Sequence, residues 1–430
     1  MTPGLQSYAV IGPRADVWPI CALLARQLPG DIAITVLEQE GRADEMTAIP
    51  VGDPLFAALR LDAVDLVSAG AGLALGYRLE GFMGEGPAII ATPSGDLPAI
   101  GGLAIHHILH RVAGEARVLD RFAELREGFR FCARAAGEGR LALPEDAPDS
   151  PLAMLGPIAV IGREALAELL EATIASGRVS KIVGAAANAA ADGIDAIAAD
   201  FVIDCRAGTP DGGIIDLPLL DAASFGADLR MDGMPVYRAL GEHHGERDRH
   251  FALREPWQGK CVRLGPASAS LGPLFASDTR LLHLQLVHLA GCLPATTDMT
   301  VEARRFNHLH RQSLERLYEF AAAPLHLNRR VEPHWQRLRN TSPPHGLDLR
   351  IEQFRSRGRL PTFDGEVVDR QSWIDLFVSL GIVPERHDRR ADGFDPRQLD
   401  RALGTIRAQL DQMLARMPNY DHYMQRLSDK

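Results

Sequence analysis

The sequence predicts an α/β fold that starts with a Rossmann-type βαβ unit and ends in a helical region. Three observations favour it. Residues 8–28 read as a short apolar strand, a turn and a helix. Residues 31–40 (DIAITVLEQE) read as a second strand, because β-branched and apolar residues alternate there. From Thr279 onward the pattern is largely helical, as expected when helices follow an α/β core.

The composition is that of a large globular protein. The chain has 430 residues, enough for two or three domains with a sizeable core. Its formal net charge of −10 argues against a nucleic-acid partner. No run of about 18 apolar residues occurs, so we expect no membrane span. The absence of a basic and apolar leader, together with five scattered cysteines, favours a cytoplasmic location with reduced thiols.

The middle of the chain predicts further helices and strands. Residues 102–114 and 161–177 carry apolar side chains at helical spacing. Residues 200–208 (DFVIDCRAG) read as a strand. Residues 209–256 are polar and irregular, and they predict no defined element.

The first turn departs from the phosphate-binding pattern G-x-G-x-x-G. Gly12 keeps the first glycine, whereas Arg14 and Val17 stand at the second and third. Pro13 removes a backbone N–H that such a turn would donate. Asp16 is predicted as the helix N-cap, where its carboxylate would repel a phosphate. Two interpretations stay open: Arg14 itself grips phosphate, or the turn is structural and binds no ligand.

Two other groups of polar residues bear on ligand binding. Glu38 ends the second strand, where dinucleotide-binding folds keep an acid for a ribose hydroxyl. His106 and His110 are four residues apart and could share one helix face. No third ligand is indicated by the spacing, so we expect no metal site.

Several segments, in the same order along the chain, carry a resemblance to a known family. Trp18 directly follows the last position of the altered turn, as in G-x-G-x-x-G-W. The other matching segments are TAIPVGDPLFAALRL (47–61), AGLALGYRLEGF (71–82), DFVIDCRAG (200–208), WQGKCVRLGPASASLGPLFASDTRLL (257–282) and the C-terminal helices up to MPNYDHYM. Over nearly its full length, the chain resembles the flavin-dependent tryptophan halogenases, which share the FAD-dependent monooxygenase fold.

This resemblance implies a fold, a cofactor and a set of site residues. Residues 1–300 would form the FAD-monooxygenase-like core, and residues 301–430 a helical C-terminal region. In the family, reduced FAD and oxygen oxidise a halide to hypohalous acid, which a lysine and a glutamate direct onto the substrate. The residues at the family's cofactor-binding positions are Gly12, Arg14, Trp18, Glu38, Asp204, Gly265 and Pro273.

The positions that the halogenation chemistry requires are altered. The lysine position, in a segment of the form F-K-L-G, falls on Ala74. The glutamate position, in P-L-E-S-T, falls on Phe275, and Asp278 replaces a residue that would bracket the halide. The family's W-x-W-x-I-P element is missing, which predicts a reduced second sheet near 80–150 and 209–256.

The altered positions favour a protein that keeps the fold without halogenase catalysis. It would act as a binding or partner subunit. Its partner would be a second copy of the chain or an active relative, and its ligand would be a small aromatic molecule. The alternative is an active FAD-dependent halogenase or monooxygenase that uses other residues on an aromatic, tryptophan-like substrate. A third interpretation is an interaction protein without a ligand pocket. The turn argues against FAD, whereas the resemblance to the family keeps FAD open as the cofactor.

Overall fold

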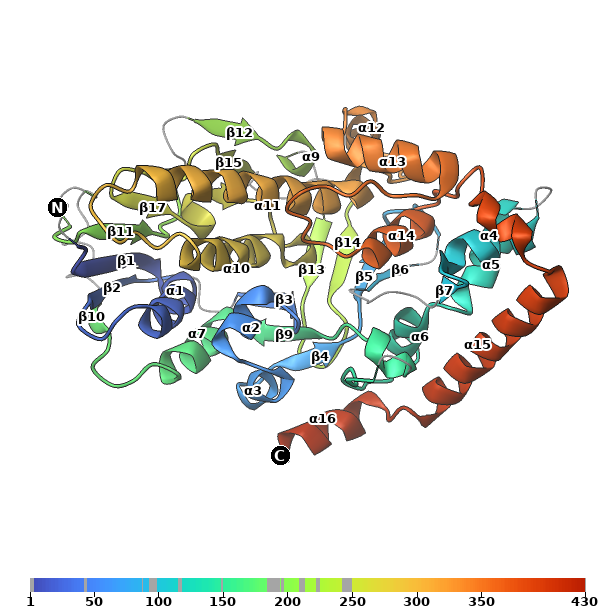
Figure 1. Ribbon diagram of the computed structural model, residues 1–430, viewed down its shortest axis with the longest axis horizontal. Helices are drawn as coiled ribbons and strands as arrows, with labels where there is room; N and C mark the ends of the chain where they lie inside the picture. The colour runs from blue at the N-terminus through green and yellow to red at the C-terminus, as the bar shows by residue number, and fades with distance from the viewer. Residues whose placement is uncertain are drawn as a thin grey trace. The chain divides into compact units, whose positions relative to one another are not determined.

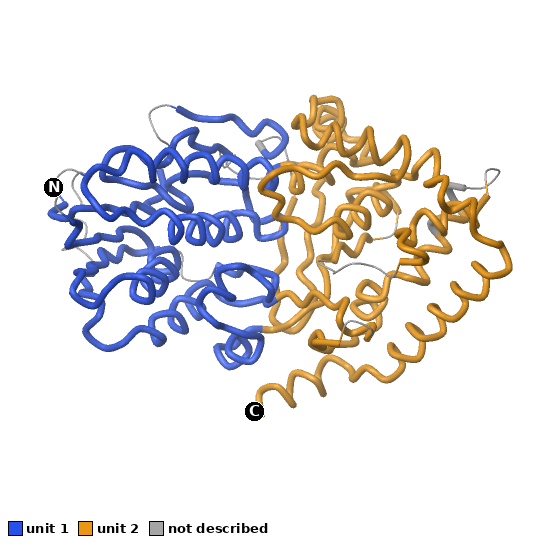
Figure 2. Tube along the Cα trace, in the orientation of Figure 1, with its two compact units in different colours: residues 1–71, 159–221, 246–318 blue, residues 72–158, 222–245, 319–430 orange. Residues whose placement is uncertain are grey.

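A computed structural model describes most of the chain and divides it into two compact units. The described residues are 4–41, 45–86, 88–92, 99–114, 118–147, 150–183, 194, 197–208, 213–221, 225–241 and 250–429. Unit 1 comprises residues 1–71, 159–221 and 246–318, and unit 2 comprises residues 72–158, 222–245 and 319–430 (Figure 2).

Unit 1 is built around a six-stranded sheet with the strand order β10-β2-β1-β11-β17-β16 (Figure 1). The strands are β1 (Ser7–Pro13), β2 (Ala33–Gln39), β10 (Ser180–Val183), β11 (Phe201–Asp204), β16 (Trp257–Gln258) and β17 (Cys261–Arg263). The central strand β1 runs parallel to both neighbours, with Val10 opposite Val36 and Ile203. β10 and β17 are also parallel to their neighbours, and β16 is antiparallel to β17. The order reverses between β1 and β11, which is where ligands bind to open α/β sheets.

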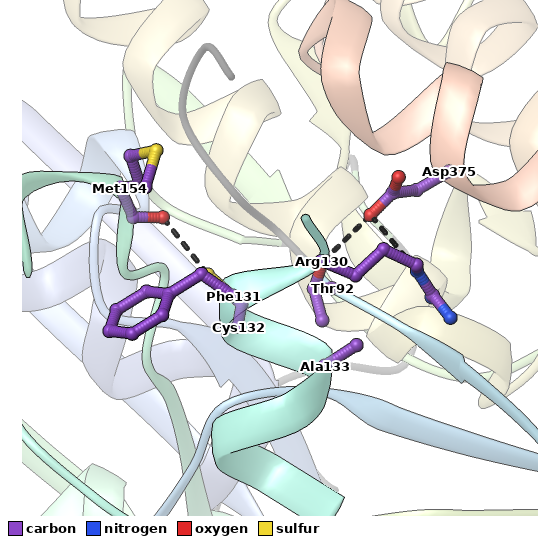
Figure 3. A pocket seen from close by; sticks show the side chains of 7 residues that line it. All are labelled: Thr92, Arg130, Phe131, Cys132, Ala133, Met154 and Asp375. Atoms are coloured by element: carbon purple, nitrogen blue, oxygen red, sulfur yellow. Dashed lines mark hydrogen bonds and ion pairs between the residues drawn. The ribbon is translucent and has the colours of Figure 1, made fainter. Parts of the chain in front are cut away.

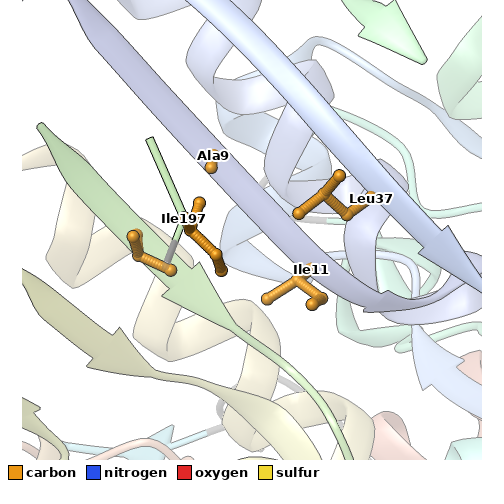
Figure 4. Close-up of a cluster of buried hydrophobic side chains, with 5 residues drawn as sticks. Ala9, Ile11, Leu37 and Ile197 are labelled. Atoms are coloured by element: carbon orange, nitrogen blue, oxygen red, sulfur yellow. The ribbon is translucent and has the colours of Figure 1, made fainter. Parts of the chain in front are cut away.

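Apolar side chains on both faces of β1 explain why this segment is a central strand. Ala9 and Ile11 point to one face, where they pack with Leu37, Ile197 and Val202 (Figure 4). Tyr8 and Val10 point to the other face and are also buried. Burial on both faces is typical of parallel sheets.

Helices and short strands complete unit 1. Helix α1 packs against α7, α10 and α2. The helices are α1 (Arg14–Gln27), α2 (Pro54–Leu59), α3 (Ala63–Ser68), α7 (Arg163–Ala172), α9 (Pro218–Asp221), α10 (Ser277–Ala290) and the first part of α11 (Thr300–His326). The short strands and 3-10 turns are β3 (Met46–Pro50), β9 (Ile158–Gly162), β12 (Ile214–Asp216), β15 (Phe251–Leu253), η4 (Gly265–Ala267), β18 (Ala269–Ser270) and η5 (Leu274–Ala276).

Unit 2 contains a four-stranded sheet in the order β13-β14-β5-β6 and most of the C-terminal helices. Its strands are β4 (Gly72–Ala74), β5 (Tyr77–Glu80), β6 (Ile89–Ala91), β7 (Ala99–Ile100), β8 (Leu103–Ala104), β13 (Phe225–Asp228) and β14 (Val236–Ala239). Its helices are α4 (Ile105–Ala113), α5 (Val118–Glu127), α6 (Phe131–Gly137), η2 (Pro151–Met154), α12 (Pro333–Asn340), α13 (His345–Arg357), α14 (Arg370–Ser379), η6 (Arg389–Gly393), α15 (Pro396–Arg416) and α16 (Tyr420–Ser428).

The predicted α/β fold, with a Rossmann-type core and a helical C-terminal part, is confirmed. The prediction that region 209–256 forms no defined element was wrong, because it contains the strands β12, β13, β14 and β15. Each of these strands has only three or four residues, too few for an alternating pattern to be recognised. The helix expected to reach Gly177 ends at Ala172. A domain boundary at residue 300 stays a prediction, since the division into two units falls within α11.

No helix within the described ranges is both long and apolar enough to cross a membrane.

Candidate functional site

The candidate site lies where β1 and β11 end, and the two strand ends approach each other closely. Gly12 has a φ of +147°, which L side chains rarely adopt. A Cβ at this position would lie 2.9 Å from the Cβ of Cys205. The Cys205 amide also donates a 2.7 Å hydrogen bond to the Ile11 carbonyl. The glycine therefore serves the packing of the two strand ends, and Cys205 takes the space beside it.

The start of α1 differs from the predicted capping. The N-cap is Pro13, which makes no side-chain capping bond, so the prediction of Asp16 as N-cap was wrong. Asp16 is the third helical residue, and its carboxylate lies 2.5 Å from the Arg163 guanidinium. Arg163 also binds Glu45 at 2.8 Å. Burial raises the pKa of the Asp16 carboxyl, and Arg163 opposes this increase.

Arg14 lies in a cluster of charged side chains, which we call the Arg14 cluster. Its guanidinium binds Glu171 at 2.5 Å, Glu164 at 3.3 Å and Glu38 at 3.5 Å. Glu164 and Glu171 are seven residues apart on α7, so both project from the same face of that helix. The members of the cluster are Arg14, Trp18, Glu38, Glu164, Glu171 and Lys181.

The carboxylate of Glu38 is bound within this cluster. One of its oxygens accepts a 2.7 Å hydrogen bond from the Trp18 indole and lies 3.0 Å from the Lys181 ammonium. The guanidinium of Arg14 and the ammonium of Lys181 lie 5.9 and 5.1 Å from the Trp18 ring. Glu38 therefore stands at the predicted position at the end of β2, but protein donors already occupy it.

The other predicted cofactor positions also have partners within the chain. Arg206 binds the Asp204 carboxylate with two 2.9 Å hydrogen bonds. The Gly265 amide donates to the Gln285 side chain at 2.8 Å. Pro273 is exposed, and its carbonyl accepts a 2.9 Å hydrogen bond from the Ala276 amide. The structure brings Gly265 close to the start of α1, because a Cβ there would lie 3.8 Å from an Asp16 carboxylate oxygen.

The family's two catalytic positions hold side chains that cannot take part in proton transfer or hydrogen bonding. Ala74 is buried in β4 of unit 2. Phe275 is buried in unit 1 with a φ of +57°, and Ala276 follows with a φ of +55°. Such left-handed conformations cost about 1–3 kcal/mol each in non-glycine residues and often mark functional segments. The segment thus has an unusual backbone, and Phe275 stands where the resemblance places the family's acid.

Asp278, next to these positions, directs its carboxylate at backbone donors. It accepts hydrogen bonds from the amides of Leu271 at 2.5 Å and Gly272 at 3.1 Å. Desolvation of the carboxyl group raises its pKa to about 7, despite these two bonds and the nearby Arg163. A carboxylate that occupies these N–H groups leaves them unavailable to a halide, and its charge repels one.

We expect the stability of the protein to fall as the pH rises from 5 to 8, through Asp278. The pKa of this carboxyl is raised from 3.8 to about 7 on folding, so its contribution is complete below pH 3.8 and is lost as the pH passes 7. The upper limit is about 4 kcal/mol, and solvent at this partly exposed residue reduces it to about 1–3 kcal/mol. Thermal unfolding of the wild type and of Asp278→Asn between pH 5 and 8 measures the difference.

The matched control for this pH dependence is Asp298→Asn. Asp278 lies in the first turn of α10, and Asp298 lies just before α11, also in unit 1. Hydrogen bonds from Thr300 lower the pKa of the Asp298 carboxyl. Its ionisation falls below the tested range, so Asp298→Asn should parallel the wild type. Parallel profiles for the wild type and Asp278→Asn would contradict the expectation.

The histidines considered as metal ligands are instead buried within unit 2. His106 bonds the Gly358 carbonyl at 2.8 Å, and His110 bonds the Pro384 carbonyl at 2.6 Å. Burial lowers the pKa of His106 to about 4 and that of His107 to about 3, so these rings are neutral at pH 7. Among the described residues, no group of three or more His, Cys, Asp or Glu is arranged to hold a metal ion.

A second polar cluster in unit 2 surrounds the carboxylate of Asp375. Arg126 binds it at 2.5 Å. Arg130 lies 3.8 Å from its other oxygen (Figure 3). A cavity of about 10 Å³ lies beside Arg130, Cys132 and Asp375. This is room for about one water molecule. Burial raises the pKa of the Cys132 thiol to about 12, so it is not a reactive nucleophile at neutral pH.

The residues at the turn do not fit the diphosphate and ribose of FAD. The ribose needs Glu38 as an acceptor, and the diphosphate needs free N–H groups and no carboxylate at the start of α1. Both requirements conflict with the bonds described above. Sequence reasoning missed Arg163, Glu171 and Lys181. One signal was available: IAVIG followed by a helix (158–172) repeats the strand, glycine and helix order of the first turn.

The strand order defines an α/β fold of the FAD-dependent monooxygenase type. Residues 240–396 match the family model for tryptophan halogenase. A flavin-dependent halogenase from Brevundimonas sp. BAL3 has 21% identity and a TM-score of 0.78, with 98% of this chain and 99% of that chain covered. A flavin-dependent halogenase from Xanthomonas campestris has 20% identity and a TM-score of 0.81, with 99% of each chain covered. Tryptophan 6-halogenase from Streptomyces toxytricini has 14% identity and a TM-score of 0.75, with 97% of this chain and 99% of that chain covered.

The family match and the shared fold agree with the resemblance seen in the sequence. Residues 240–396 thus resemble the tryptophan halogenase family, and the fold is the one that the flavin-dependent halogenases have.

Proposed function

We propose that this chain does not catalyse halogenation and acts as a binding or partner subunit. The observation that carries the proposal is the engagement of Glu38 by Trp18, Arg14 and Lys181. A ribose hydroxyl would have to displace these charge-assisted contacts to reach the carboxylate. Such contacts are about twice as strong as neutral hydrogen bonds, so displacement is unfavourable.

The altered catalytic positions support the same proposal. Ala74 has no ammonium to position an oxidant, and Phe275 has no carboxylate to move a proton. The Asp278 carboxylate occupies two backbone donors beside the family's halide position. These changes affect separate steps of one reaction, whereas the strand order of the core is kept.

As a subunit, the protein would work through its surface or through a small aromatic ligand. It would form a homo-oligomer or join an active relative. Light scattering after size-exclusion chromatography measures the homo-oligomer, and calorimetric titration with tryptophan and indole measures the ligand. A monomer that binds neither compound would leave the active relative as the partner.

The experiment that tests the loss of catalysis has two parts on the full chain. The absorbance spectrum of the purified protein is recorded, and oxidised and reduced FAD are titrated by fluorescence and calorimetry. The protein is then supplied with reduced FAD, oxygen, bromide or chloride, and tryptophan or indole, and products are measured by mass spectrometry. We expect a colourless protein, no saturable FAD binding and no halogenated product.

The alternative function is an active flavin-dependent halogenase or monooxygenase on an aromatic substrate. The retained parallel order around β1 and the positive φ of Gly12 favour it. A yellow protein with saturable FAD binding and enzyme-dependent product would establish this alternative and overturn our proposal.

A further inference from the structure

The carboxylate of Asp16 lies where a dinucleotide's diphosphate binds in folds of this class. The first backbone N–H groups of α1 carry the positive end of the helix dipole, which attracts anions. Asp16 is the third residue of this 14-residue helix and is only 3% exposed. Its side chain therefore places a negative charge inside the structure at the helix start.

Segments that are distant in the sequence meet around this carboxylate. Arg163 at the start of α7 binds it at 2.5 Å, and Gly265 lies against it from the turn after β17. Gly12 is in contact with Cys205, directly after β11. The carboxylate thus occupies the switch point of the sheet, where strand order reverses and ligands bind.

The surrounding charges already balance without a ligand. Arg163 is shared between Asp16 and Glu45, and the Asp278 carboxyl also interacts with Arg163 and Asp16. A diphosphate would add negative charge to a site with three carboxylates around one guanidinium. It would also have to compete with Asp16 for Arg163.

We propose that the Asp16–Arg163 pair is a built-in substitute for the cofactor's diphosphate. It neutralises the start of α1 from within the chain and closes the site to diphosphates. This inference rests on the proposed function, because it explains how the family's fold is kept without FAD. The inference concerns the carboxylate of Asp16 alone, so it can be wrong while the proposed function is right.

The test removes that carboxylate and offers a diphosphate in its place. Asp16→Ala is compared with the wild type by calorimetric titration with inorganic pyrophosphate and ADP, with circular dichroism to confirm folding. We expect no saturable binding to the wild type. Asp16→Ala removes the carboxylate from the helix start and leaves Arg163 paired only with Glu45 and near Asp278. It should bind pyrophosphate saturably, with a dissociation constant at least about tenfold below the highest concentration at which the wild type shows no binding. Asp16→Asn keeps the shape of the side chain and should shift binding in the same direction, by less.

Asp62→Ala is the matched control. Asp62 caps α3 by accepting hydrogen bonds from Val64 and Asp65, and it is exposed and outside the site. Its replacement should lower stability without creating pyrophosphate binding. Pyrophosphate that binds Asp62→Ala as tightly as Asp16→Ala would show a non-specific effect and overturn the proposal.

The outcomes separate this inference from the proposed function. Saturable pyrophosphate binding by the wild type would overturn the inference that the Asp16–Arg163 pair replaces a diphosphate. This holds whether or not any halogenation is detected. Equal pyrophosphate affinity of a folded Asp16→Ala or Asp16→Asn and the wild type would do the same. Halogenated product from the wild type would overturn the proposed function, even if Asp16→Ala gained pyrophosphate binding.

Discussion

Asp375→Leu is expected to destabilise the protein by about 3–5 kcal/mol, because it leaves two buried guanidinium groups with only the exposed carboxylate of Glu127. The side chains of Asp375, Arg126 and Arg130 are 6%, 3% and 7% exposed. Burial alone would raise the pKa of Asp375, but the two arginines hold it below its usual value. Asp375 is therefore ionised, and the packing of α14 against α5 depends on its negative charge.

Thermal and urea unfolding of Asp375→Leu and Asp411→Leu measure this effect against a control. Asp411 binds Arg134 at 2.7 Å, but the two side chains are 48% and 25% exposed. Solvent screens this pair, so its removal should cost less than about 1 kcal/mol. Equal losses in both variants would show that burial does not determine the contribution of Asp375.

The fold could be predicted because its signals are local. The alternation in residues 31–40 and the apolar run before Gly12 mark β2 and β1, and tertiary burial follows from them. The N-cap of α1 could not be predicted from the residue preference of Asp16. Its carboxylate is drawn to Arg163, which lies 147 residues further along the chain. Contacts between residues so far apart in the chain produce no recognisable spacing pattern in the sequence.

The sequence predicted Glu38 at the end of β2, but it did not predict the side chains that bind Glu38. The Lys181 ammonium binds both Glu38 and Glu171. Lys181 and Glu171 belong to β10 and α7, which are distant from β2 in the sequence. In the sequence, these charged residues are typical of the solvent-exposed face of any helix or strand. Only the parallel pairing of β10 with β2, which sets Val183 opposite Glu38, brings them together.

Arg163→Met is expected to destabilise the protein by about 3–5 kcal/mol, because Asp16 would be left as a buried charge without a cation. The Asp16 side chain is 4% exposed, and Arg163 also balances Glu45 and Asp278. Thermal and denaturant unfolding measure the loss. A drop of less than about 1 kcal/mol would show that solvent, and not Arg163, stabilises the carboxylate.

The double variant Arg163→Met with Asp16→Leu separates charge from packing. Replacing both members of a buried ion pair by apolar side chains is often neutral or stabilising, so it should recover most of the lost stability. A double variant as unstable as Arg163→Met would mean that Arg163 acts through packing alone. Recovery would show that the start of α1 needs its charges balanced from within the chain. In a relative whose turn carries glycines in place of Arg14 and Val17, a bound diphosphate would supply that balance.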